Sequence, residues 1–267
     1  MSQKKSEKGK VYFIGAGPGD PSLLTIKAKT LIDHSNLIIY TGSLISRKIF
    51  NEAKKARILD SAGMHLEQIV EAMVTAVNEG AIVARVHDGD PSVFGALLEQ
   101  MIPLEENGVE YEVVPGVSSV FAAVAALNSE LTIPEVSQTL ILTRVGGRTR
   151  MPRGQELREL AIHNATIVCY LSAVLIDKAV KELIKGGYSK ETPVAVVQRA
   201  SCPDEKIIRG SLANIAERTH EAKIETQALI MVGEVFREDI KRLGLKHRSK
   251  LYDKNFSHSF RKAIPKS

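Results

Sequence analysis

The chain has 267 residues, of which 44% are hydrophobic and 25% are charged, a composition typical of a soluble globular protein. At about 100–200 residues per domain, this length favours one large or two modest domains. No run of 18 apolar residues occurs, and residues 1–10 lack the apolar core of a secretory signal. Two cysteines, Cys169 and Cys202, are too few for a disulfide framework or a structural zinc site. We therefore expect a cytoplasmic protein that does not span or bind a membrane.

The net charge of +5 is concentrated at the two ends of the chain. Residues 1–10 carry four Lys against one Glu, and residues 241–267 carry nine Lys or Arg against Asp253 alone, so the body between them is acidic. No Trp is present and aromatic residues make up 5%, which offers no stacking platform for single-stranded nucleic acid. We expect no nucleic-acid partner. The alternative is a binding module driven by the two basic ends, which salt-dependent retention on duplex or RNA would reveal.

In the first half of the chain, apolar runs alternate with turn-rich loops and helical periodicity. Strands are predicted at residues 11–14, 36–40, 57–60, 82–86 and 109–114. Helices are predicted from Leu23 to Asp33, with Ser22 as the N-cap, and from Leu66 to Asn78. The regular alternation of strand, loop and helix favours an α/β fold with a largely parallel sheet.

The second half repeats this pattern. Strands are predicted at 139–143, 166–171, 193–197 and 228–232, a helix at 174–185 ending at Gly186, and an exposed loop at 145–156. A turn-rich stretch near Pro115–Ser119 suggests a boundary between two domains. The predicted organisation is a flexible basic N-terminus (1–10), an N-terminal α/β domain (11–117), a C-terminal α/β domain (118–240) and a basic tail (241–267).

Three glycines, Gly15, Gly17 and Gly19, lie between a predicted strand and a predicted helix. In a dinucleotide-binding fingerprint, such glycines bring a pyrophosphate to the helix N-terminus. That fingerprint requires the spacing G-x-G-x-x-G and an acidic residue about 20 positions further on. Here the spacing is G-x-G-x-G, and the next strand ends in Tyr40-Thr41-Gly42. The mismatch disfavours both an NAD(P) enzyme and the common Rossmann-like methyltransferase site.

Three motifs follow one another along the chain: residues 15–21 (GAGPGDP), 85–91 (RVHDGDP) with Phe94-Gly95 behind them, and 114–119 (VPGVSS). With the strands at 193–201 and 227–233, they give residues 10–240 a resemblance to the tetrapyrrole methylase family, the class III S-adenosylmethionine-dependent methyltransferases. The resemblance implies two α/β domains with mostly parallel or mixed sheets, an active site in the cleft between them, and a homodimer.

Further segments narrow the resemblance. Residues 61–67, 130–135, 141–144 and 147–149, and the tail at 248–254 and 260–262, resemble family members that methylate C11 of cobalt-precorrin-4, giving cobalt-precorrin-5A, in anaerobic cobalamin biosynthesis. The cofactor so implied is S-adenosylmethionine, with S-adenosylhomocysteine as product. Metal-free precorrin-4 or another precorrin carbon is the alternative substrate. Residues 63–67 argue against the members that methylate diphthine intermediates or ribosomal RNA.

The resemblance also implies which residues contact each ligand. Cofactor contacts carried over from the motifs are Pro18, Asp88, Gly89, Asp90, Val93, Ser118, Ser119, Leu171 and Ala200. Gly89 and Ala200 suit close backbone approach because their side chains are absent or small. The position of Leu171 is often Met in the family, so only apolar packing is carried over there. Residues implied to line the substrate trough are Gly15, Gly17, Asp20, Tyr40 and Met64, with core packing as the alternative for the last two.

The methyl group of a sulfonium is already electrophilic, so the enzyme needs to align the reactants and exclude water rather than supply a nucleophile. Accordingly, the sequence shows no Ser-His-Asp, Cys-His or H-E-x-x-H arrangement, and we expect no protein-bound metal, since cobalt would arrive inside the substrate. Asp90 is predicted to orient the cofactor or help remove a proton, with an Asx turn before Pro91 as the alternative. His65 and His87 are candidate bases, each with a loop or helix-cap role as the alternative.

The acetate and propionate groups of a corrinoid precursor call for Arg donors, which stay charged and pair bidentately. Arg85, Arg144 and Arg148 are predicted to bind these carboxylates. Arg144 is the best candidate because it ends a buried strand. Arg150 and Arg153 fit a solvated loop equally well. The basic tail is open to three interpretations: it covers a partner subunit, it covers the mouth of the cleft, or it is a solvated extension.

Overall fold

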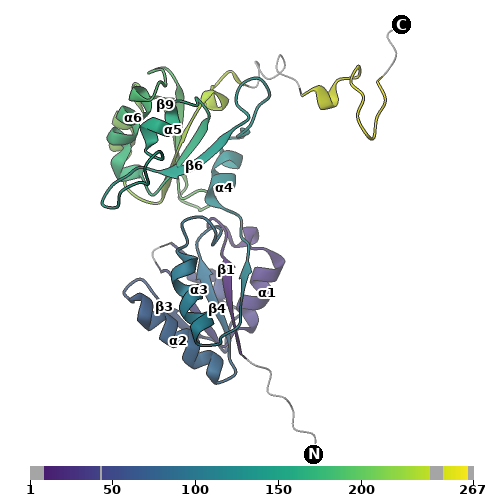
Figure 1. Ribbon diagram of the computed structural model, residues 1–267, viewed down its shortest axis with the longest axis vertical. Coiled ribbons are helices and arrows are strands. Elements are labelled where there is room, and N and C mark those ends of the chain that lie inside the picture. Colours follow the sequence, from purple (N-terminus) through teal and green to yellow (C-terminus); the bar gives the residue numbers. More distant parts are fainter. Residues whose placement is uncertain (1–8, 43, 241–248, 264–267) are drawn as a thin grey trace, which may run out of the picture. The chain divides into compact units, whose positions relative to one another are not determined.

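The computed structural model describes residues 9–42, 44–240 and 249–263. The chain forms two compact units, each built around a five-stranded sheet (Figure 1). Unit 1 runs to Ala122 and also includes Arg199–Asp204; unit 2 comprises Ala123–Gln198 and the chain from Glu205 onward. The predicted class, two α/β domains with mostly parallel or mixed sheets, is confirmed: one sheet is parallel and the other is mixed. The division between the units falls inside a helix, a few residues after the expected boundary.

The sheet of unit 1 is entirely parallel, with strand order β3-β2-β4-β1-β5. Its central strands are mostly apolar and largely buried on both faces, as parallel sheets covered by helices require, and β4 adds two buried polar residues, Arg85 and His87. The strands are β1 (Lys10–Gly15), β2 (Leu37–Tyr40), β3 (Arg57–Asp60), β4 (Ile82–His87) and β5 (Tyr111–Val114).

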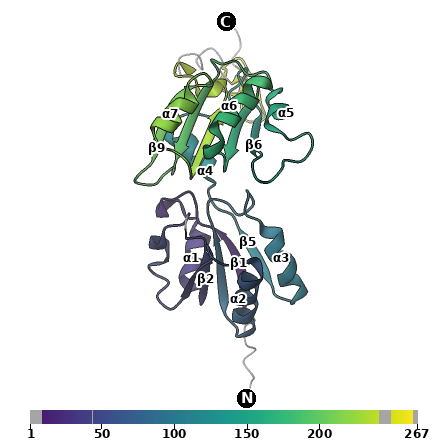
Figure 2. The ribbon, with the colours of Figure 1, turned by 90° about the vertical axis from the view of Figure 1, so that its left-hand side faces the viewer.

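Helices cover both faces of this sheet (Figures 1 and 2). Helix α1 (Ile26–His34) packs on one face, where Ile32 meets strand residues such as Ile14 and Ile38. Helices α2 (Leu66–Asn78) and α3 (Leu97–Glu106) pack on the other face, around Phe13, Ile39, Met73 and Leu104. The two faces therefore bury alternate residues of each strand.

The start of α1 differs from the prediction. Its N-cap is Thr25, whose hydroxyl accepts a hydrogen bond from the N–H of Ala28 at 3.1 Å, and not Ser22. Ser22 lies instead in a 3-10 turn (Pro21–Leu23) capped by Asp20, because Pro21 favours the first position of such a turn. Helix α2 has the predicted bounds, from Leu66 to Asn78.

Unit 2 has a mixed sheet with strand order β6-β7-β10-β8-β9, in which β6 and β7 are the only neighbouring strands that pair in parallel. Helices α5, α6 and α7 pack around a core that includes Ile167, Ile176, Leu183 and Ile230. Its strands and helices are β6 (Leu140–Arg144), β7 (Thr166–Tyr170), β8 (Pro193–Gln198), β9 (Lys206–Ser211), β10 (Ala228–Val232), α4 (Ser119–Ala126, shared with unit 1), α5 (Leu157–Ala161), α6 (Ile176–Lys185) and α7 (Ile215–Glu221). As predicted, α6 ends at Lys185 and is capped by Gly186.

Short 3-10 turns complete the two units, at Arg47–Phe50, Ala173–Leu175 and Glu234–Phe236, and a further one, Lys250–Tyr252, lies in the C-terminal part of the chain. Over the residues that the structure describes, no helix has both the length and the apolar character needed to cross a membrane.

The strand order of unit 1 marks one place on its sheet. Neighbouring strands β1 and β4 lead the chain in opposite directions, β1 towards β2 and β4 towards β5 at the far edge. In open α/β sheets, ligands bind beyond the carboxyl ends of two strands that diverge in this way. The loops that follow β1 and β4 are therefore the first place to look for a site.

Candidate functional site

Two of the sequence motifs are joined at the carboxyl edge of the unit 1 sheet. Gly17, after β1, and Gly89, after β4, pair through their backbones: the N–H of Gly17 donates to the Gly89 carbonyl at 3.2 Å, and the N–H of Gly89 donates to the Gly17 carbonyl at 2.9 Å. The N–H of Ala16 also donates to the carbonyl of His87 at 2.8 Å. The first and second motifs therefore form one rigid edge.

The third motif packs onto this edge without space for side chains. A Cβ atom on Gly15 would lie 2.6 Å from the Cα of Gly116, and a Cβ atom on Gly116 would lie 2.2 Å from the carbonyl oxygen of Gly89. Gly17 and Gly89 also have positive φ angles of 73° and 59°, which favour glycine. The glycines are thus required by the contact of three backbones.

Asp90 ties the second motif to the third. Its Oδ2 accepts the N–H of Gly116 at 2.9 Å, and its Oδ1 accepts the N–H of Ser92 at 2.9 Å together with the Ser92 hydroxyl. Burial opposes ionisation of Asp90, but these hydrogen bonds outweigh it and lower the pKa of the carboxyl group. The Asx turn is thus present, and an acid with a lowered pKa is a weak proton acceptor.

Unit 1 brings together nearly all the predicted cofactor residues. They are Pro18, Asp88, Gly89, Asp90, Val93, Ser118 and Ser119 on the three motif loops, and Ala200 on the loop between β8 and β9. This last loop meets the first motif directly, because the N–H of Asp20 donates to the hydroxyl of Ser201 at 3.1 Å. Gly19 is close to Cys202, whose Sγ would lie 2.3 Å from a Cβ at position 19.

Leu171, the remaining predicted cofactor residue, belongs to unit 2. It directly follows β7 and is 71% exposed, with a positive φ of 53°. A leucine in the left-handed region is unfavourable, and an exposed leucine gains nothing from core packing. This combination is typical of residues held for a function.

The end of β4 carries three titratable groups. His87 is 8% exposed; burial and then the charge of Arg85 lower its pKa to about 3, and its Nε2 has no hydrogen-bond partner. Burial raises the pKa of Asp88 to about 6, although a hydrogen bond from the Gly89 N–H favours its ionised form. His87, predicted as a base, is therefore a neutral and weakly basic imidazole.

Arg85 lies inside the unit rather than at its surface. It is 5% exposed, its Nε donates to Oε1 of Gln100 at 2.7 Å, and its Nη1 donates to the carbonyl of Ile39 at 3.3 Å. Burial lowers its pKa to about 10, so it stays a cation at neutral pH. The alternation of β4 turns position 85 towards α3, which places this guanidinium where it cannot grip carboxylates from solution.

Other predicted residues have structural partners. His65 is the exposed N-cap of α2, and its N–H donates to Oε1 of Gln68 at 2.9 Å. Tyr40, at the end of β2, is buried and packs edge-on against Phe50, while Met64 packs against the core beneath α2. Tyr40 and Met64 therefore contribute to packing, and His65 contributes to the start of α2.

The predicted arginines of unit 2 divide into two kinds. Arg144 ends β6, and its guanidinium donates to the carbonyls of Thr149 and Arg150 at 3.3 and 3.2 Å. It therefore shapes the loop at 145–156 from within. Arg148 is exposed on that loop, so its guanidinium faces solvent.

Sequence reasoning missed Asp60, which joins the loops after β2 and β3. Its Oδ1 accepts the N–H groups of Ala62 and Gly42, both at 2.9 Å, and these two hydrogen bonds lower the pKa of Asp60. Ser61 supports the same junction, since its N–H and its hydroxyl both donate to the carbonyl of Tyr40, at 2.8 and 3.0 Å. An aspartate directly before a Ser-Ala-Gly turn was the available signal.

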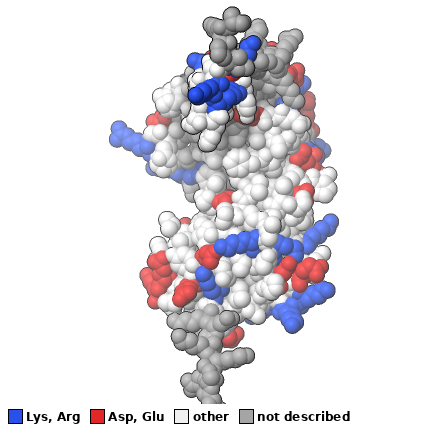
Figure 3. Space-filling view, turned by 90° about the vertical axis from the view of Figure 1, so that its right-hand side faces the viewer, with Lys and Arg blue, Asp and Glu red and all other residues white. Residues whose placement is uncertain are grey.

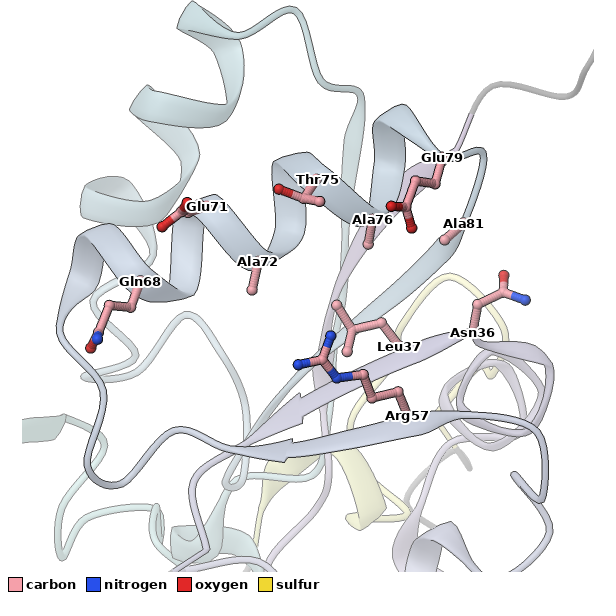
Figure 4. Close-up of a pocket in the computed structure, with 10 residues that line it drawn as sticks. All are labelled: Asn36, Leu37, Arg57, Gln68, Glu71, Ala72, Thr75, Ala76, Glu79 and Ala81. Carbon is pink, nitrogen blue, oxygen red and sulfur yellow. The ribbon is translucent and has the colours of Figure 1, made fainter.

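A polar pocket of about 420 Å³ lies at the opposite end of the same sheet (Figure 4). Asn36 and Arg57, at the amino ends of β2 and β3, face α2 across it, and the guanidinium of Arg57 extends towards the helix. None of the three motifs reaches this pocket, so the convergence of motifs and strand ends places the candidate site at the carboxyl edge.

The fold and the three joined motifs define a class of protein. Residues 10–216 match the family Tetrapyrrole (Corrin/Porphyrin) Methylases, and the chain belongs to this family. It is 53% identical over 258 residues to a cobalt-precorrin-4 C(11)-methyltransferase from Methanocaldococcus jannaschii, covering 96% of this chain and 98% of the relative. It is 47% identical over 225 residues to a precorrin-4 C(11)-methyltransferase from Pseudomonas aeruginosa, covering 84% and 90%.

Solved structures give the same classification. The X-ray structure of a cobalamin biosynthetic enzyme, cobalt precorrin-4 methyltransferase, matches with a TM-score of 0.85 and 45% identity, covering 87% of this chain and 98% of that one. Uroporphyrin-III C-methyl transferase from Thermus thermophilus, complexed with S-adenosyl homocysteine, matches with a TM-score of 0.73 and 30% identity, covering 85% and 98%.

The backbone contact at the motifs predicts the effect of Gly116→Ala. Because the new Cβ would lie 2.2 Å from a carbonyl oxygen, the loops must separate, and we expect a loss of about 2–4 kcal/mol in unfolding free energy in urea. Gly63→Ala is the matched control, because a Cβ there meets no atom within 4 Å. Equal stability of the two variants would contradict the interlocked arrangement.

The raised pKa of Asp88 predicts a pH-dependent gain from Asp88→Asn. The folded protein binds the proton of the Asp88 carboxyl group more tightly than the unfolded chain does. Ionisation of Asp88 therefore lowers the unfolding free energy by up to about 3 kcal/mol above pH 6. Below pH 4 the group is protonated in both states, and the effect disappears. We expect the Asn variant to be the more stable one at pH 7.5 and equal to the parent at pH 4, in urea unfolding at both pH values. An identical difference at the two pH values would refute the assignment.

Proposed function

We propose that this protein transfers a methyl group from S-adenosylmethionine to C11 of cobalt-precorrin-4. The observation that carries the proposal is that the three motif loops lock together in a chain that is 53% identical, over nearly its whole length, to a protein of that name. The alternative substrate is metal-free precorrin-4, which the name of the Pseudomonas aeruginosa relative supports. We rank it second because the identity to that relative, 47%, is below the 53% identity to the cobalt-precorrin-4 enzyme.

The proposed cofactor site is the carboxyl edge of unit 1, and its residues fit a sulfonium ligand. Asp88 is a largely buried carboxyl group whose ionised form lacks a cationic partner among the described ion pairs. A cation bound beside it would favour ionisation and offset the burial of the carboxylate. The relative solved with S-adenosyl homocysteine supports the same class of ligand. When bound, S-adenosylmethionine supplies an electrophilic methyl group.

The protein's own contribution is to hold this edge rigid. The paired backbones of Gly17 and Gly89 and the carboxylate of Asp90 fix the loops before any ligand arrives, so little ordering remains to be done on binding. Of the titratable groups at the end of β4, Asp88 has the pKa closest to neutrality, about 6. The pKa of His87, about 3, makes its imidazole too weak a base to accept a proton at neutral pH. We therefore assign Asp90 to positioning, and Asp88 is the better candidate for handling a proton.

For the substrate, we propose that exposed arginines on the loop at 145–156 bind the carboxylates of the macrocycle. Arg148, Arg150 and Arg153 are exposed there, while Arg144 holds the loop that presents them. Arg85 is withdrawn from this role because it is buried. We propose no resident metal: cobalt enters as part of the substrate. A homodimer is the proposed assembly.

The direct test is an anaerobic incubation with isotopically labelled S-adenosylmethionine, read by mass spectrometry. Separate reactions with cobalt-precorrin-4 and with precorrin-4 discriminate the two substrates. We expect one added methyl group, located at C11, with the cobalt form as the preferred acceptor. Preference for the metal-free form would replace the substrate, and no methyl transfer to either, with cofactor still bound, would refute the proposed reaction.

Asp60→Ala tests the substrate side of the site. The Ala variant loses the acceptor that joins the loops after β2 and β3, so we expect KM for the tetrapyrrole to rise at least about fivefold, with cofactor affinity unchanged. Asp60→Asn keeps an oxygen in place and serves as the control, which should restore most of the activity. A parallel loss of cofactor affinity in the Ala variant would show a general structural defect.

A further inference from the structure

The C-terminal segment, residues 249–263, has a defined conformation of its own. Arg261 holds it together, because Nη2 donates to the carbonyls of Leu251 at 2.6 Å and Asp253 at 2.7 Å. Ser249 caps the 3-10 turn Lys250–Tyr252, and the N–H of Ala263 donates to the hydroxyl of Ser257 at 2.9 Å. The backbone is thus preformed and needs little ordering on binding.

This segment exposes the side chains that usually bury themselves. Tyr252 is 80% exposed and Phe260 is 97% exposed, and Leu251 and Phe256 are also exposed. Three of the chain's 13 aromatic residues fall within these 15 positions, so the exposure is concentrated rather than scattered. Four basic residues, Lys250, Lys254, Arg261 and Lys262, stand against Asp253. Apolar side chains displayed with cations on an ordered backbone indicate a docking element.

A groove with the complementary character lies between α2 and α3. It has a volume of about 400 Å³, and its apolar lining comes from Leu66, Val70, Val74 and Pro103. Glu67 and Glu71 lie along the same groove and are exposed. Glu71 can be followed on α2 in Figure 4, since it also borders the polar pocket on the other side of that helix.

The charge around this groove is strongly one-sided. The only charged residues among those that line it are Glu67 and Glu71, both acidic, and neither takes part in an ion pair in the described part of the chain. On the α1 side the acids are neutralised instead: Glu112 pairs with two lysines, and both signs of charge lie side by side in Figure 3.

We propose that the groove between α2 and α3 receives the C-terminal segment of a second copy of this chain. Apolar side chains of the segment pack on the apolar lining of the groove, and its lysines pair with Glu67 and Glu71. The two surfaces are therefore complementary in both hydrophobicity and charge. In a two-fold symmetric dimer, each chain places its segment in the groove of the other, so both grooves are filled.

Charge exchange tests this pairing with the full chain. Glu67→Lys/Glu71→Lys and, separately, Lys250→Glu/Lys254→Glu are expected to raise the dimer dissociation constant at least about tenfold in sedimentation equilibrium. Combining both pairs of substitutions restores the attraction and should recover most of the affinity. Glu52→Lys, an exposed charge reversal of unit 1 outside the groove, is the control and should leave the constant unchanged.

A second variant addresses the apolar contact. Tyr252→Ser/Phe260→Ser should weaken the dimer without changing the thermal unfolding of the body, because both side chains are exposed in the single chain. The proposal is overturned if the full chain stays monomeric at every concentration that sedimentation equilibrium can reach. It is also overturned if the dimer dissociation constant does not change with these substitutions, or if the effects of the two charge reversals add up instead of compensating each other. The proposal would also be overturned if the segment docks on its own chain, which would appear as protection of its backbone amides from hydrogen exchange that does not depend on protein concentration.

Discussion

The carboxyl edge of unit 1 depends on the contact of three backbones at Gly15, Gly89 and Gly116. A single added carbon at Gly116 would lie 2.2 Å from a carbonyl oxygen, so only glycine permits this contact. Because the contact occurs where β1 and β4 diverge, it fixes three loops at the place where open α/β sheets bind ligands. The positions of Asp88, Asp90 and Ser118 all follow from it.

Burial then differentiates polar groups that lie close together in the sequence. Asp90 is held by N–H donors and has a lowered pKa, whereas burial raises the pKa of Asp88 and lowers that of His87. Two aspartates two positions apart therefore have different chemistry: Asp90 holds loops through hydrogen bonds, and Asp88 has a pKa closer to neutrality. The chain belongs to the family Tetrapyrrole (Corrin/Porphyrin) Methylases, and this edge is its proposed cofactor site.

Much of this arrangement could be predicted from the sequence. Apolar runs ended by Gly and Pro identified the strands of unit 1, and periodicity gave both ends of α2. Three features were beyond local patterns. Helix α3 contains Pro103 and begins after Ala96 in the left-handed region, so it lacks the usual start signals, and β9 is an edge strand of mixed polarity. The burial of Arg85 depends on Gln100, a partner that only the folded chain brings near.

The central claim is that the interlocked loops of unit 1 hold the cofactor. The most direct measurement is a crystal structure of the protein grown with S-adenosylhomocysteine. We expect the ligand to lie against the loops that follow β1, β4 and β5, next to Asp88 and Ser118. A ligand found instead in the polar pocket between α2 and β3, with the three loops free, would contradict it.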